Sequence, residues 1–155
     1  MKTQVQTLIV GAGIVGSSAA YYLARYGRKS ILVIDKGELF ENDGSTSHAP
    51  GGVNPLSNNP AMAKLAGDSI ELYESLPLWK PGRKPLYMVG GLDVARTAAR
   101  MNEVKRLYTN GKGFGVEVHM ISPSQIPELF PLMSSKPFVG GLFTPRKPVV
   151  AGPHV

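Results

Sequence analysis

The chain has 155 residues, enough for one ordinary domain with a buried core, and its 18 Gly and 13 Pro predict many turns. It has no Cys, which excludes disulfides, thiolate metal sites and a thiol nucleophile. The net charge of +6 comes from Lys and Arg scattered over residues 80–155 without interleaved aromatic residues, which indicates solvated surface and argues against a nucleic-acid partner.

The first predicted unit is a strand, a helix and a second strand. Thr7–Val10 is a short apolar run without alternation, which is typical of a parallel strand buried on both faces. Residues 14–26 have a helical pattern, and Gly27 stands where a helix is expected to end. Residues 30–35 (SILVID) predict a second buried strand. These elements together predict a right-handed βαβ unit.

A glycine turn, GAGIVG at residues 11–16, lies between the first strand and the helix. Gly11 permits a tight turn, Gly13 lets the backbone approach a pyrophosphate, and Gly16 lets the helix pack closely on the strand. The N-terminus of the helix offers free N–H groups and a partial positive charge to phosphates. Asp35 ends the second strand, where its carboxylate can accept both ribose hydroxyls and disfavours NADP. The unit predicts dinucleotide binding without separating FAD from NAD.

The stretch 8–24 follows Lys2 and is superficially similar to a signal peptide. Its glycines are in phase with the nucleotide-binding turn, however, and a strand follows directly. No stretch of the sequence is long and apolar enough to span a bilayer. We therefore predict a soluble, cytoplasmic protein that has no membrane partner.

The remaining elements follow in chain order. Residues 37–60 are rich in Gly, Ser, Asn and Pro, which predicts a long ordered loop. A helix is expected over residues 61–76, with a buried face made of Met62, Leu65, Ser69, Leu72 and Leu76. Strands are expected at residues 86–89, 91–94, 116–121 and 138–144. An amphipathic helix is expected over residues 96–108, ended by the glycines at 111, 113 and 115. A capping box at residues 122–125 predicts the start of a further short helix. Alternation places His119 on the solvent face of its strand.

Residues 44–52 read GSTSHAPGG and follow the βαβ unit. On the residues alone, His48 is interpreted as a surface histidine in a polar loop. The segment resembles the second cofactor motif of the D-amino-acid-oxidase-like (DAO) flavoproteins, in the branch of dimethylglycine oxidase, dimethylglycine dehydrogenase and sarcosine dehydrogenase. Residues 91–131, which end in SPSQIPELFP, are similar to the same branch, so that the resemblance covers most of residues 5–145. It implies that His48 carries FAD through a covalent bond to the 8α carbon.

The glycine turn and the resemblance together give a set of expected cofactor ligands. The expected FAD-binding residues are Gly11, Gly13, Ile14, Val15, Gly16, Asp35, Lys36, Ser45, Thr46, Ser47, His48 and Gly52. The three hydroxyl side chains are small donors suited to ribityl and pyrophosphate oxygens. Covalent attachment needs a neutral imidazole, which histidine provides near pH 7. The sequence identifies no catalytic residue and no metal-ligand pattern.

The predicted fold is α/β: a Rossmann-like FAD-binding βαβ unit plus an incomplete part of an α+β substrate domain. Residues 1–80 are expected to form the N-terminal part of the FAD-binding domain and residues 81–145 part of the substrate domain with its antiparallel sheet. Residues 146–155 are expected to be a truncated tail. A doubly wound fold needs further strands, and the family's substrate-binding residues would lie beyond Val155.

The resemblance implies oxidation of the C–N bond of an N-methylated amino acid or related amine, of the dimethylglycine or sarcosine type. Hydride equivalents would pass to the flavin, and the iminium would hydrolyse to the demethylated amine and formaldehyde. Tetrahydrofolate would enter only through a further C-terminal domain. Two alternatives stay open: a non-catalytic nucleotide-binding remnant and an NAD-dependent enzyme, the second disfavoured by residues 44–52. The sequence indicates no oligomeric state.

Overall fold

The computed structural model describes residues 4–38, 44–77 and 84–150. The described chain forms two compact units, which divide between Pro50 and Gly51. This division comes earlier than the domain boundary predicted at residue 80. The reason is that Gly52 forms a bridge with Val149 and that the Val53 N–H donates to the Pro148 carbonyl at 3.0 Å, which ties residues 51–53 to the second unit.

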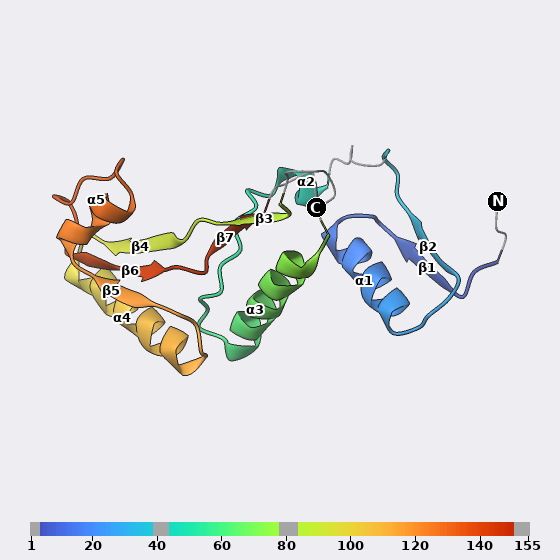
Figure 1. The fold of residues 1–155 in the computed structure, drawn as a ribbon, viewed down its shortest axis with the longest axis horizontal. Helices are drawn as coiled ribbons and strands as arrows, with labels where there is room; N and C mark the ends of the chain where they lie inside the picture. The colour runs from blue at the N-terminus through green and yellow to red at the C-terminus, as the bar shows by residue number, and fades with distance from the viewer. Residues whose placement is uncertain (1–3, 39–43, 78–83, 151–155) are drawn as a thin grey trace. The chain divides into compact units, whose positions relative to one another are not determined.

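The first unit is the predicted βαβ arrangement (Figure 1). Strand β1 (Thr7–Val10) and strand β2 (Ile31–Ile34) pair in parallel, and helix α1 (Ile14–Arg25) connects them. Gly27 ends the helix with φ +82°, a left-handed conformation that glycine adopts without strain, and its N–H donates to the Ala24 carbonyl. The prediction for this unit is therefore confirmed in element order, helix end and parallel pairing.

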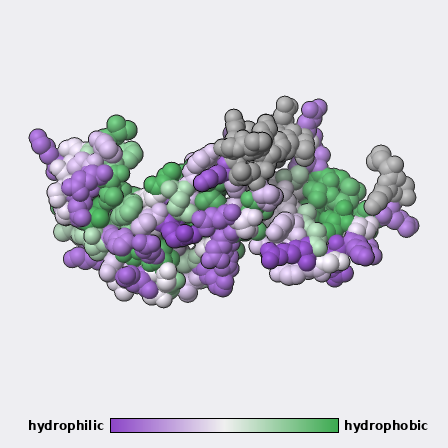
Figure 2. All heavy atoms as spheres, viewed as in Figure 1, coloured by the Kyte–Doolittle hydropathy of each residue, from purple (hydrophilic) through white to green (hydrophobic). Residues whose placement is uncertain are grey.

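The prediction that both strands are buried on both faces is wrong. Residues of β1 and β2 alternate between half-buried and exposed, and the Val10 side chain is 78% exposed. A two-stranded sheet with one helix has only one covered face, because coverage of a parallel sheet on both faces requires further elements. Figure 2 shows the resulting apolar surface gathered on this unit.

The second unit is built around a three-stranded antiparallel sheet (Figure 1). Strand β6 (Gly140–Thr144) lies between β4 (Gly91–Ala95) and β5 (His119–Ile121). Helix α4 (Ala98–Gly113) packs against this sheet. The buried core consists of Leu56, Ala95, Val104, Val118 and Leu142, and Met101 and Tyr108 of α4 pack against it.

Helix α4 continues through Gly111, where the sequence predicted a break. Gly111 is buried, and a Cβ at this position would lie 2.9 Å from Leu56 Cδ2 and 3.2 Å from the Val118 methyl groups. The glycine therefore allows close packing within the core, which offsets its lower helix propensity. The helix ends at the next glycines, and Gly115 has φ +77°.

Residues assigned to the truncated tail form part of a second small sheet. Strand β3 (Leu86–Met88) pairs antiparallel with β7 (Pro148–Val150). A Cβ at Gly51 would lie 2.5 Å from the Val150 carbonyl oxygen, so the backbone there approaches β7 closely. Residues 148–150 thus form a strand that the sequence did not predict, because their ladder partners lie far away in the sequence. Residues 151–155 lie outside the described residues.

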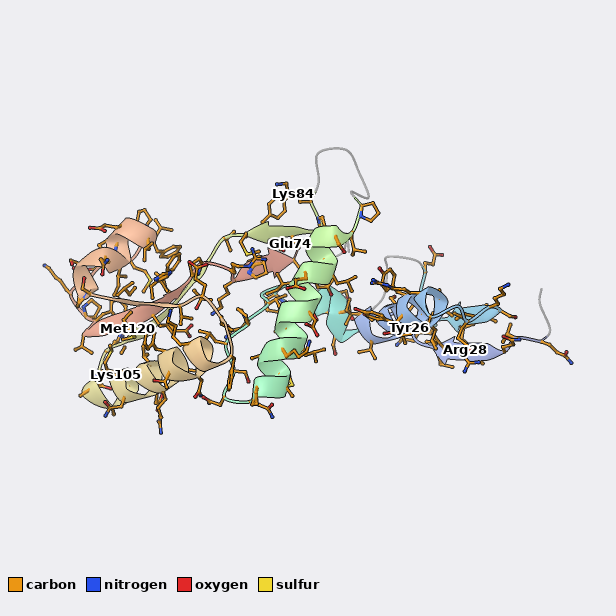
Figure 3. All side chains as sticks on the ribbon, turned by 60° about the horizontal axis from the view of Figure 1, so that its bottom comes forward. Tyr26, Arg28, Glu74, Lys84, Lys105 and Met120 are labelled. Carbon is orange, nitrogen blue, oxygen red and sulfur yellow. The ribbon has the colours of Figure 1, made fainter. Side chains whose placement is uncertain are left out.

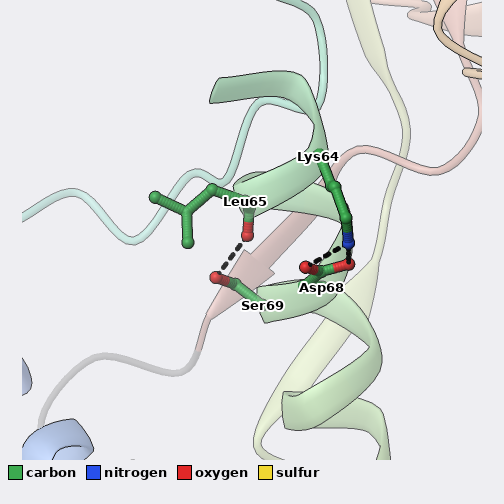
Figure 4. Close-up of polar contacts among 4 residues, drawn as sticks. All are labelled: Lys64, Leu65, Asp68 and Ser69. Carbon is green, nitrogen blue, oxygen red and sulfur yellow. Dashed lines mark hydrogen bonds and ion pairs between the residues drawn. The ribbon is translucent and has the colours of Figure 1, made fainter. Parts of the chain in front are cut away.

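Helix α3 (Pro60–Ser75) forms close to its predicted bounds, with the Asn59 side chain accepting from the Ala61 N–H at its start. The predicted face is wrong for Met62 and Leu65, which are 55% and 58% exposed, whereas Ala63 and Ile70 are buried. The other three predicted residues, Ser69, Leu72 and Leu76, are half-buried. Figure 4 shows two polar contacts within this helix: Lys64 pairs with Asp68 at 2.7 Å, and the Ser69 hydroxyl donates to the Leu65 carbonyl. Such an exposed pair adds little stability.

Three short elements complete the described chain. The 3₁₀ turn Pro123–Gln125 leads into helix α5 (Ile126–Leu129), and the Ser122 N–H donates to Gln125 Oε1 at 2.9 Å, as the capping box predicts. Helix α2 (Ser45–His48) is a single turn inside the segment predicted as loop. Among the described helices, none has the length and apolar character required to cross a membrane.

Candidate functional site

The glycine turn closes against the start of α1 as its residue types require. Gly11 has φ +106°, and its N–H donates to the Ile34 carbonyl at 2.7 Å. A Cβ at Gly16 would lie 1.8 Å from the Gly11 carbonyl oxygen, a distance that no side chain tolerates. Gly16 therefore lets the first turn of α1 lie directly on the loop, so that the helix N-terminus faces the carboxyl ends of both strands.

Asp35 has a structural role that the sequence did not predict. Its Oδ2 accepts the Ala12 N–H at 2.6 Å, and its Oδ1 accepts the Gly37 N–H at 3.1 Å. These backbone donors, Ala12 first, hold the pKa of the Asp35 carboxyl below its ordinary value of 3.8. Each carboxylate oxygen has two lone pairs, so both oxygens can still accept a ribose hydroxyl.

This bonding predicts an acid-sensitive turn. The pKa of Asp35 is lower in the folded state than in the unfolded state. The ionised carboxylate therefore stabilises the fold at a pH above the unfolded-state pKa, and this stabilisation is lost as the pH falls through the folded-state pKa. We expect Asp35→Asn to lower the melting temperature at pH 7, with a difference from wild type that shrinks below about pH 4. Thermal melts followed by circular dichroism between about pH 7 and pH 2.5 measure this. A difference in melting temperature that stays constant over the whole pH range contradicts this role of Asp35.

His48 ends the single turn of α2, which begins after Gly44. The His48 Nδ1 lies 3.1 Å from the Gly44 carbonyl oxygen and 3.2 Å from the Ser47 hydroxyl oxygen. Since a carbonyl oxygen only accepts, the first contact requires a proton on Nδ1. In the neutral ring this leaves the lone pair on Nε2. The local backbone thus selects the tautomer whose outer nitrogen is a nucleophile.

A cavity of about 610 Å³ joins the glycine turn to the second motif. Its lining consists of Val10, Gly11, Gly13, Ile34, Asp35, Lys36, Gly44, Ser45 and Thr46. The predicted residues of both motifs therefore meet at the carboxyl ends of β1 and β2, the edge at which parallel sheets bind ligands. Val10 and Ile34 were not predicted to line the site, although both residues end a parallel strand at the edge where such sheets bind ligands.

The other predicted residues lie outside that lining. Val15 is 81% exposed in the first turn of α1, and the Ile14 N–H donates to the Thr46 hydroxyl at 3.0 Å. Gly52 belongs to the second unit, where it forms a bridge with Val149, so the first unit does not bring it together with the rest. His119 is exposed on β5, as predicted, with Nε2 3.1 Å from Glu117 Oε1. The described residues contain no group of three or more side chains suited to a metal.

Known proteins match this chain over nearly its whole length. The family model described as DAO, FAD dependent oxidoreductase, matches residues 6–154. The mitochondrial dimethylglycine dehydrogenase of Homo sapiens is 34% identical over 144 residues, which is 93% of this chain and 16% of that protein. The mitochondrial pyruvate dehydrogenase phosphatase regulatory subunit of Mus musculus is 29% identical over 155 residues, which is 100% of this chain and 17% of that protein. The chain therefore spans about a sixth of the length of these relatives.

Solved structures share the fold. The crystal structure of L-proline dehydrogenase from P. horikoshii superimposes with a TM-score of 0.83 at 23% identity. The match covers 99% of this chain and 39% of the other. At this identity the likeness concerns the fold, and the partial coverage agrees with the incomplete fold predicted from the sequence.

Proposed function

Because the chain belongs to the DAO family of FAD-dependent oxidoreductases, we propose that it is the cofactor-binding N-terminal part of an enzyme that oxidises the C–N bond of an N-methylated amino acid or related amine. The observation that carries the proposal is the cavity shared by the glycine turn, Asp35 and the second motif. The similarity to a dimethylglycine dehydrogenase supports this substrate class.

The residues of the first unit fit the ADP half of FAD. The turn at Gly11, Gly13 and Gly16 leaves the start of α1 open to the pyrophosphate, and no side chain projects from these three positions. Asp35 holds the turn in shape through the Ala12 N–H and keeps lone pairs for the adenosine ribose. Lys36 lines the same cavity and would contribute a positive charge to a site for an anionic nucleotide.

His48 is the proposed point of covalent attachment. With Nδ1 donating to the Gly44 carbonyl, Nε2 is the nitrogen that would bond to the 8α carbon of the ring. Formation of the bond between Nε2 and the 8α carbon would release two hydrogens overall, which dioxygen would accept. When bound, FAD supplies the redox chemistry by accepting hydride equivalents from the carbon next to the amine nitrogen. The contribution of the chain is to bind and orient the cofactor.

Titration with FAD tests the proposal. We expect the purified chain, stripped of flavin, to quench the fluorescence of added FAD at micromolar or lower concentration and to bind NADH and NADPH at least about tenfold more weakly. Binding of NADH in preference to FAD would instead favour an NAD-dependent enzyme. A chain that binds none of the three nucleotides contradicts the proposed function.

A second candidate is a non-catalytic protein of the same family. It is favoured by the similarity to a regulatory subunit, which matches this chain along its whole length. The two candidates differ in amine turnover by a protein that also contains the substrate-binding part expected beyond Val155: reduction of its bound flavin by dimethylglycine or sarcosine, seen as loss of flavin absorbance without oxygen, supports the enzyme. Flavin that binds but stays oxidised with every N-methylated amine favours the non-catalytic protein.

A further inference from the structure

Thr46 connects two segments that are 32 residues apart in the sequence. Its Oγ1 accepts the N–H of Ile14, the first residue of α1, at 3.0 Å. The helix cap, Gly13, has no side chain with which to accept any of the unpaired N–H groups of the first helical turn. The Thr46 hydroxyl therefore takes the place of an N-cap side chain, supplied from α2 instead of the preceding residue.

Gly13 makes this contact possible. A Cβ at position 13 would lie 3.0 Å from Thr46 Oγ1, tighter than most real contacts of a Cβ. The missing side chain thus serves a second purpose besides access for a pyrophosphate, because it lets α2 approach the helix end. A threonine hydroxyl both accepts and donates, so its own proton is left for an anionic oxygen at the same place.

The same turn holds His48. The Ser47 N–H and hydroxyl both reach the Gly44 carbonyl, at 3.2 Å and 2.8 Å, and His48 Nδ1 lies 3.1 Å from that oxygen. These bonds hold together the single turn that carries Thr46 and His48. The link from Thr46 to α1 consequently fixes where the imidazole lies relative to the glycine turn.

We propose that Thr46 is a positioning residue for the attachment of flavin to His48, acting through its hydrogen bond to the Ile14 N–H. The inference rests on the proposed function, since it presumes that His48 is the attachment point. Thr46 orients α2 on the end of α1, so that one motif binds the pyrophosphate while the other presents Nε2 in a fixed place.

Three variants separate this role from general stability. Thr46→Val keeps the shape but loses the acceptor, Thr46→Ser keeps the hydroxyl, and Thr97→Val removes the hydroxyl that accepts the Arg100 N–H at the start of α4. Incubated with FAD, Thr46→Val is expected to accumulate acid-stable flavin about tenfold more slowly than wild type, and Thr46→Ser within about threefold. Thr97→Val is expected to melt at a lower temperature with an unchanged attachment rate.

Hydrogen exchange at Ile14 provides a measurement that needs no flavin. We expect the Ile14 amide to exchange about tenfold faster in Thr46→Val and at nearly the wild-type rate in Thr46→Ser. Unchanged exchange in Thr46→Val, or attachment at the wild-type rate, overturns the inference. A wild-type chain that attaches no flavin contradicts covalent attachment at His48 and the role of Thr46 in it, whereas exchange at Ile14 still decides whether Thr46 ties the two segments together.

Discussion

Gly16→Ala is expected to weaken FAD binding strongly and to destabilise the first unit. The new methyl carbon would lie 1.8 Å from the Gly11 carbonyl oxygen and 3.3 Å from Ile9 Cγ2, so the turn or the start of α1 has to move. Overpacking typically costs about 1–3 kcal/mol, and a rigid backbone neighbour places this variant at the upper end of that range. The displaced N–H groups no longer converge on the pyrophosphate, and we expect the affinity for FAD to fall by about 100-fold or more.

Gly67→Ala is the matched control for that variant. Gly67 lies inside α3, and a Cβ there would meet no atom within 4 Å. Alanine has the higher helix propensity, so we expect a stability gain of up to about 1 kcal/mol and unchanged FAD binding. Thermal melts and FAD titrations of both variants measure these effects. A Gly16→Ala chain that binds FAD as wild type does contradicts the placement of the cofactor on this turn.

His48→Ala is expected to remove all covalently bound flavin while leaving noncovalent binding. The glycine turn and Asp35 are unchanged in this variant, so FAD still binds but leaves on denaturation. After incubation with FAD and acid precipitation, we expect a yellow pellet from wild type and a colourless pellet from the variant.

The control for His48→Ala is His119→Ala. His119 is an exposed histidine on β5 that contacts Glu117, in the other compact unit. We expect this variant to retain acid-stable flavin at the wild-type level. Flavin that remains in the His48→Ala pellet would show that another residue forms the bond and would contradict the assignment of His48.

The sequence was sufficient to predict the βαβ unit because its signals are local. The glycine turn, the left-handed Gly27 and the acid at position 35 lie within one short stretch, and each constrains its immediate neighbours. The second motif was found by resemblance, since a polar loop with one histidine has no periodicity of its own. The bond from Asp35 to the Ala12 N–H and the cap supplied by Thr46 were not predicted, because both join residues more than twenty positions apart.

The wrong predictions share a physical cause, which is that burial depends on what packs against an element. An apolar run such as Thr7–Val10 is compatible with a sheet covered on both faces, but the described chain covers only one. The apolar pattern of α3 predicted that Met62 and Leu65 are buried, whereas the contacts of the second unit bury Ala63 and Ile70. Gly111 is read locally as a helix breaker, and only the position of Leu56 shows why the helix continues.

Mass spectrometry of the peptide that contains His48 tests the central claim most directly. Trypsin cleavage after Lys36 and Lys64 releases residues 37–64, in which His48 is the single histidine. From wild-type protein incubated with saturating FAD, we predict this peptide with the added mass of FAD less two hydrogens, and fragmentation that places the addition on His48. Recovery of only the unmodified peptide, with all flavin free in the acid supernatant, contradicts covalent attachment at this residue.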